Sequence, residues 1–146
     1  MNSFWAPALL VIFANVSFHI IQKSIFPGAH PLVSVMVTYS VGIMTCALLL
    51  FFFPLKQSLF GEIINLNWAS FALGVAIVGI EVGYLLMYRQ GWAVSIGPVF
   101  SYGLTALLLI PLGLLFFAEK LAWQNVMGIF ITIGGVYLLT WKPDQI

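Results

Sequence analysis

Residues 68–88 read WASFALGVAIVGIEVGYLLMY, and Glu81 is the one charged side chain among them. An α-helix needs about 20 mostly apolar residues to cross the hydrocarbon core of a bilayer. Trp68 opens the stretch and Arg89 follows it, and both residue types are typical of the boundary between lipid and water. The stretch therefore predicts a transmembrane helix with a single acidic side chain inside it.

The composition of the whole chain agrees with a lipid environment. Of its 146 residues, 62% are hydrophobic and 6% are charged, and the mean hydropathy is +1.11. Soluble domains carry about 25% charged residues, because their surfaces face water. The net charge of +1 is too small to indicate a nucleic-acid partner. We therefore expect an integral, multi-pass membrane protein.

Four further apolar stretches flank the first, and all four are close to the length of a membrane span. They are residues 4–21, 32–53, 95–117 and 123–141. Prolines, glycines and charged residues separate them, and all five tryptophans lie at their predicted ends. The sequence thus predicts an all-α, polytopic five-helix bundle that forms one domain over residues 1–146. Residues 55–67 are compatible with a short helix lying in the membrane interface.

The basic residues give little preference for one orientation in the membrane. With five spans, Lys56 and Lys120 fall on the side of the N-terminus, whereas Lys23, Arg89 and Lys142 fall on the other. The positive-inside rule responds to the difference in Lys and Arg between the two sides, which is small here. We expect either insertion in both orientations, which would allow an antiparallel homodimer resembling an inverted repeat, or pairing with an inverted partner chain.

Two polar stripes are candidate substrate or proton sites. On the third predicted span, Tyr84 and Tyr88 follow Glu81 at i+3 and i+7, so the three side chains share a face. On the first, Asn15, His19 and Gln22 have the spacing of one helical face. Ionisable groups at membrane depth are costly and are often functional. We expect Glu81 to exchange a proton for a substrate, with Tyr84, Tyr88, Asn15 and His19 lining the site; a structural hydrogen-bonding role is the alternative.

Small residues recur at helical spacing on the last two predicted spans. These candidates for close helix packing or dimer contacts are Gly97, Ser101 and Thr105 on one span and Gly128, Thr132 and Gly135 on the next. Small side chains let helix backbones approach closely in lipid, which makes packing within the chain the simpler interpretation.

No sequence pattern indicates an enzyme. The chain lacks a nucleotide-binding P-loop and a cysteine–histidine cluster at metal-ligand spacing. Its single cysteine, Cys46, lies in an apolar run, and the deep polar residues do not form a nucleophile–base set. We expect no cofactor, no metal and no catalytic site.

Residues 110–139, IPLGLLFFAEKLAWQNVMGIFITIGGVYLL, resemble the closing hairpin of EamA-like transporters of the drug/metabolite transporter superfamily. The similar features are Glu119-Lys120 at the turn, Gly128 entering the last helix and Gly134-Gly135 near its end. The resemblance implies one five-helix EamA-like unit, whereas typical members carry two units as an inverted pair. It also implies transport of small metabolites across a bacterial-type plasma (inner) membrane.

In the related small multidrug resistance proteins the essential glutamate lies in the first helix, whereas the deep acid here is Glu81 in the third span. Together the residues and the resemblance favour a secondary transporter of a small metabolite or drug-like compound, proton-coupled and working as an antiparallel dimer. Two alternatives remain: a subunit of a heterodimeric lipid-linked sugar flippase, formed with a related short chain, and a non-transporting membrane accessory protein.

Overall fold

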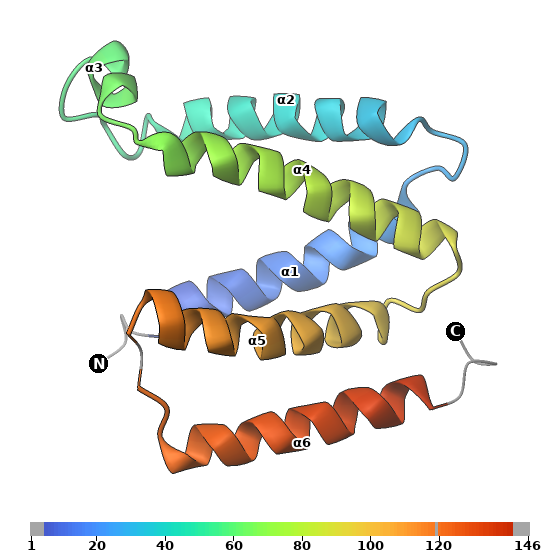
Figure 1. Ribbon diagram of the computed structural model, residues 1–146. Coiled ribbons are helices and arrows are strands. Elements are labelled where there is room, and N and C mark those ends of the chain that lie inside the picture. Colours follow the sequence, from blue (N-terminus) through green and yellow to red (C-terminus); the bar gives the residue numbers. More distant parts are fainter. Residues whose placement is uncertain (1–4, 119, 142–146) are drawn as a thin grey trace. The chain divides into compact units, whose positions relative to one another are not determined.

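A computed structural model describes residues 5–118 and 120–141 of the chain (Figure 1). Within these residues it contains six helices: α1 (Ala6–Ser24), α2 (Pro31–Leu49), α3 (Leu59–Ile64), α4 (Trp68–Arg89), α5 (Gly97–Phe116) and α6 (Trp123–Thr140). The predicted all-α class is therefore confirmed. Phe4, Glu119 and Lys142, which enter the sequence analysis, lie outside the described residues.

Four of the helices are long and apolar enough to cross a membrane, as in a multi-pass integral membrane protein. They are α1 and α2 with 19 residues each, α4 with 22 and α5 with 20. The rise of about 1.5 Å per residue gives each a length close to the roughly 30 Å of a hydrocarbon core. The helix α6 is also apolar but shorter.

Local sequence explains where the helix ends differ from the predicted ranges. The helix α2 stops at Leu49, before the predicted end at Phe53, and Leu50 follows it as the C-cap with helical backbone angles. Pro54 disfavours the α conformation in Phe53, so the helix does not reach its predicted end. The helix α5 begins at Gly97 with Pro98 in its first turn, where the missing N–H of proline does no harm. The helix α1 continues past Ile21 to Ser24 and places the basic Lys23 in its last turn.

The chain divides into two compact units. Among the described residues, the first comprises 5–23, 87–118 and 120–141, and contains α1, the last turn of α4, α5 and α6. In this unit α5 and α6 are consecutive helices that lie side by side and run in opposite directions (Figure 1). The side chain of Val136 packs closely over Gly103, where an added Cβ would lie 2.6 Å from Cγ2 of Val136.

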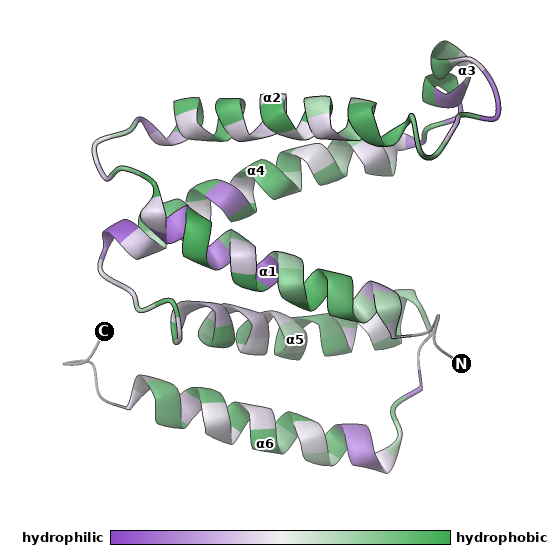
Figure 2. Ribbon diagram, turned by 180° about the vertical axis from the view of Figure 1, so that it is seen from behind, coloured by the Kyte–Doolittle hydropathy of each residue, from purple (hydrophilic) through white to green (hydrophobic). Residues whose placement is uncertain are grey.

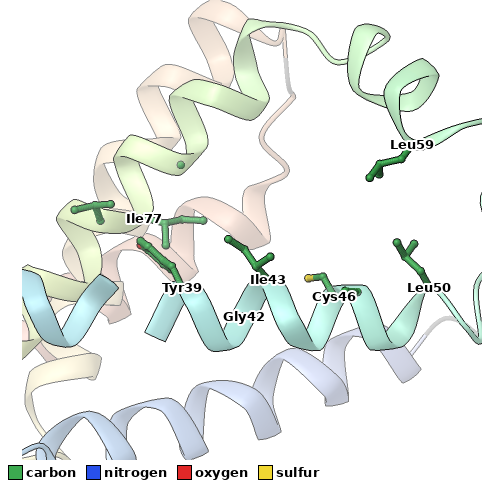
Figure 3. Close-up of a pocket in the computed structure, with 10 residues that line it drawn as sticks. Tyr39, Gly42, Ile43, Cys46, Leu50, Leu59 and Ile77 are labelled. Carbon is green, nitrogen blue, oxygen red and sulfur yellow. The ribbon is translucent and has the colours of Figure 1, made fainter. Parts of the chain in front are cut away.

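The second unit comprises residues 24–86, and contains α2, α3 and most of α4. The side chain of Ser58 caps α3 by accepting a 3.2 Å hydrogen bond from the backbone N–H of Gly61. This short helix lies within residues 55–67. A cavity of about 740 Å³ opens between α2 and α4, and Leu59 of α3 forms part of its lining (Figure 3).

The distribution of polar and apolar side chains is the reverse of that in a soluble protein. The ribbons of α1 and α4 are mostly hydrophobic and are interrupted by hydrophilic positions (Figure 2). Phe13 of α1 is 74% exposed and Val75 of α4 is 76% exposed, whereas His19 is 4% and Glu81 8% exposed. Apolar side chains that point outward and polar ones that are buried fit a surface surrounded by lipid.

Candidate functional site

A chain of hydrogen bonds joins α1, α5 and the last turn of α4 in the first unit. His19 is at its centre: Nε2 lies 2.9 Å from the hydroxyl of Tyr102, and Nδ1 lies 2.9 Å from the hydroxyl of Tyr88. The Tyr102 hydroxyl in turn donates a 3.1 Å hydrogen bond to Oδ1 of Asn15. Four polar side chains are thus linked in one row.

The direction of each hydrogen bond in this row follows from the number of protons available. A tyrosine hydroxyl has one proton, and that of Tyr102 is donated to Asn15, so His19 must donate from Nε2 to the Tyr102 oxygen. In the neutral imidazole the other nitrogen carries no proton and is an acceptor. Tyr88 therefore donates its hydroxyl proton to Nδ1 of His19, and all three bonds point from Tyr88 toward Asn15.

The sequence brings these residues together through helical spacing and a glycine turn. Asn15 and His19 are four residues apart on α1 and so share a face. After α4 the chain turns at Gly91, whose φ of +96° favours glycine, and the N–H groups of Gly91 and Trp92 bond back into the last turn. Residues 93–96 then lead from this turn to the start of α5 at Gly97.

The start of α5 packs closely against Met87 and Tyr88 at the end of α4. Gly97 is buried, and a Cβ added there would lie 2.7 Å from Cε of Met87 and 3.6 Å from Cε1 of Tyr88. The absence of a side chain at Gly97 thus lets the end of α4 approach α5. We infer that Gly97, expected from the sequence to mediate helix packing, also supports the hydrogen-bonded row.

Lys23 lies at the end of α1 beside the same row. Its Nζ donates a 3.0 Å hydrogen bond to the backbone carbonyl of Trp92 and lies 5.9 Å from the centroid of the Tyr88 ring. The second distance is within the range of a cation–π contact. Lys23 thus connects the end of α1 to the turn that follows α4 through this hydrogen bond.

A cavity of about 450 Å³ opens between α1 and α5 next to the row. Asn15, His19 and Tyr102 supply its polar lining. Its apolar lining consists of Ile12, Val16, Ile20, Val94 and Pro98. Such a combination of apolar walls and a few polar groups is common in small-molecule sites.

The second unit holds the other two predicted site residues. Glu81 is 8% exposed and Tyr84 is 7% exposed, and both lie on the buried face of α4, together with the nearly inaccessible Leu85. The structure therefore brings Asn15, His19 and Tyr88 together in one unit and places Glu81 and Tyr84 in the other.

The predicted small-residue faces are only partly used in helix packing. Thr132 and Gly135 line a cavity of about 550 Å³ between α5 and α6, and the Thr132 hydroxyl bonds to the carbonyl of Gly128. A Cβ at Gly128 or Gly135 would meet nothing within 4 Å. Ser101 is partly exposed and Thr105 is exposed.

Two residues that the sequence analysis does not single out prove central to this unit. Tyr102 connects His19 to Asn15, and Gly103 of α5 packs against Val136 of α6. The sequence does indicate a role for Tyr102, because it places a phenol in the middle of an apolar span, where the hydroxyl needs a hydrogen-bond partner. Gly103 carries no such signal, because glycines are frequent in membrane helices.

Among the described residues, no group of three or more histidine, cysteine, aspartate or glutamate side chains is arranged to hold a metal ion.

Comparison of the chain with protein-family models, with curated proteins and with solved structures finds no match.

Proposed function

We propose that this protein is a secondary transporter that moves a small molecule across a membrane in exchange for protons. The proposal is carried by the burial of Glu81, a carboxyl group 8% exposed in a helix whose apolar side chains point outward. An acid placed this way in a membrane helix is costly and is typical of ion or substrate pathways. Tyr84, buried one turn further along α4, would line the same site.

In the proposed mechanism Glu81 binds either a proton or a cationic or zwitterionic substrate, but not both. The site opens to the other side of the membrane only when Glu81 holds a proton or a substrate. Movement of the substrate in one direction is therefore coupled to movement of protons in the other. The chain has no P-loop and would rely on the ion gradient.

The assembly in this proposal is an antiparallel dimer of five-span chains. The helix α6 has 18 residues, about 27 Å at 1.5 Å per residue, which is nearly the thickness of the hydrocarbon core. Five spans place the two termini on opposite sides, so two copies in opposite orientations would form an inverted repeat. The resemblance to EamA-like transporters supports the same arrangement and a location in a bacterial-type plasma membrane.

Proton release in sealed vesicles tests this function. The purified chain is reconstituted into liposomes that contain a pH-sensitive dye, and tetraphenylphosphonium or an amino acid is added outside as the probe. We expect proton efflux with the wild type and none with Glu81→Gln, while Glu62→Gln, which alters an acid of the short helix α3, behaves as the wild type. Equal fluxes from the wild type and Glu81→Gln would remove Glu81 from the mechanism.

One observation favours the flippase subunit as the second candidate. Apart from Tyr39, the residues that line the cavity between α2 and α4 are small or apolar, and they include Gly42, Cys46 and Leu50 (Figure 3). Such a surface suits an acyl or isoprenoid chain better than a polar metabolite. Under this alternative, the chain alone is inactive in vesicles, and activity requires a second short chain.

A further inference from the structure

The hydrogen-bonded row of the first unit ends in a donor that has no acceptor. The amide oxygen of Asn15 accepts a hydrogen bond from the hydroxyl of Tyr102. Among residues 5–118 and 120–141, the Asn15 amide nitrogen has no hydrogen-bond partner. An amide N–H₂ left without an acceptor in an apolar environment is costly, and Asn15 lines the cavity between α1 and α5.

We propose that this cavity binds a small apolar molecule through a hydrogen-bond acceptor, such as a carbonyl or ether oxygen, that accepts from the amide N–H₂ of Asn15. The five apolar lining residues would surround the body of the ligand. The inference goes beyond the proposed transport: it concerns binding in the first unit and does not require Glu81.

The direction of the hydrogen bonds in the row favours a ligand that carries an acceptor over one that carries a donor. Its hydrogen bonds all point toward Asn15, so each one polarises the next and strengthens the final N–H as a donor. If His19 takes up a proton, both ring nitrogens donate, and only its bond with Tyr88 reverses direction. The bonds to Tyr102 and Asn15 keep their direction, so the preference for an acceptor holds in both charge states of His19.

The depth of Asn15 excludes the ester carbonyls of lipids as the source of the oxygen. Asn15 lies nine residues from Ala6 and nine from Ser24, which at 1.5 Å per residue places it about 13 Å from either end of α1. Lipid esters lie at the edge of a hydrocarbon core about 30 Å thick. The acceptor must therefore belong to a molecule that enters the core, which requires it to be largely apolar.

Photolabelling with benzophenone tests the site, because its carbonyl is an acceptor and, when excited, attacks nearby C–H bonds. The full-length protein in lipid nanodiscs is irradiated with benzophenone, and the labelled peptides are mapped by mass spectrometry. We expect labels on segments 12–20 and 94–98. Diphenyl sulfoxide, an acceptor, should compete, whereas 1,1-diphenylethylene, which has the shape of benzophenone but a CH₂ in place of oxygen, should compete roughly fivefold more weakly.

Variants test the donor itself. Asn15→Leu keeps a similar volume without the N–H₂ and should lower labelling of these segments roughly fivefold. Asn125→Leu, at the exposed start of α6, is the control and should label as the wild type. Equal competition by the sulfoxide and the alkene on the wild type would overturn the proposal whether or not Asn15→Leu folds. Undiminished labelling of a monodisperse Asn15→Leu protein would overturn it as well.

Discussion

Tyr88 and His19 are 69 positions apart in the sequence, and a hydrogen bond of 2.9 Å joins the Tyr88 hydroxyl to Nδ1 of the His19 ring. The same ring bonds through Nε2 to Tyr102 of α5. One imidazole therefore connects three helices in a region where the backbone offers few free polar partners. This arrangement gives His19 a structural role in addition to any part in proton transfer.

Replacing His19 should lower the stability of the protein. His19→Phe keeps an aromatic ring but removes both nitrogens and leaves the Tyr88 and Tyr102 hydroxyls without their ring partner. Side-chain hydrogen bonds in membrane proteins contribute roughly 0.6–1.7 kcal/mol each. We expect a loss of about 1–3 kcal/mol in the free energy of unfolding, measured by titration with a denaturing detergent.

The matched control for this prediction is His30→Phe. His30 is exposed, precedes α2 and makes no side-chain capping bond there. It should change the free energy of unfolding by less than about 0.5 kcal/mol. If the two substitutions have equal effects, the hydrogen-bonded row does not stabilise the fold.

Adding a single methyl group at Gly103 should disturb the contact between α5 and α6. A Cβ at this position would lie 2.6 Å from Cγ2 of Val136, whose branched side chain has little rotamer freedom in a helix. Overpacking of this kind typically costs about 1–3 kcal/mol. Gly103→Ala should therefore be destabilising in the same unfolding assay.

Two companion variants separate the clash from a general effect of alanine. Gly134→Ala adds the same methyl group where nothing lies within 4 Å, and it should be neutral or stabilising by up to about 1 kcal/mol. Combining Gly103→Ala with Val136→Ala removes the clashing methyl and should recover most of the loss. If the losses in the free energy of unfolding from the two single substitutions simply add in the double variant, the contact with Val136 is not the cause of the destabilisation by Gly103→Ala.

The orientation of the chain should respond to its few basic residues. Reporter fusions at the C-terminus, one active only in the cytoplasm and one only outside it, should both be active with the wild type. Replacing Lys56 and Lys120 by glutamine leaves Lys and Arg on one side only, so the C-terminus should become cytoplasmic. Glu62→Gln should have little effect, because acidic residues contribute little to the rule. A wild type with a single orientation would contradict the homodimer and favour an inverted partner chain.

The length and apolar composition of the segments predict the helices well, because the cost of unpaired backbone groups in lipid leaves few alternatives. The polar face of Asn15 and His19 was also predictable, since helical spacing alone places them together. Tyr102 was not, because its pairing with α1 depends on which faces of two helices meet, and neither sequence segment encodes that by itself. The same is true of the contact between Gly103 and Val136.

The proposal that Glu81 exchanges a proton for substrate is tested most directly by infrared difference spectroscopy of the protein in lipid. Perfusion with tetraphenylphosphonium should remove the carbonyl stretching band of a protonated carboxyl group in the wild type and in Glu62→Gln. Glu81→Gln should show no such change. A wild-type spectrum without a carboxyl band, or an identical band change in Glu81→Gln, would contradict the proposed mechanism.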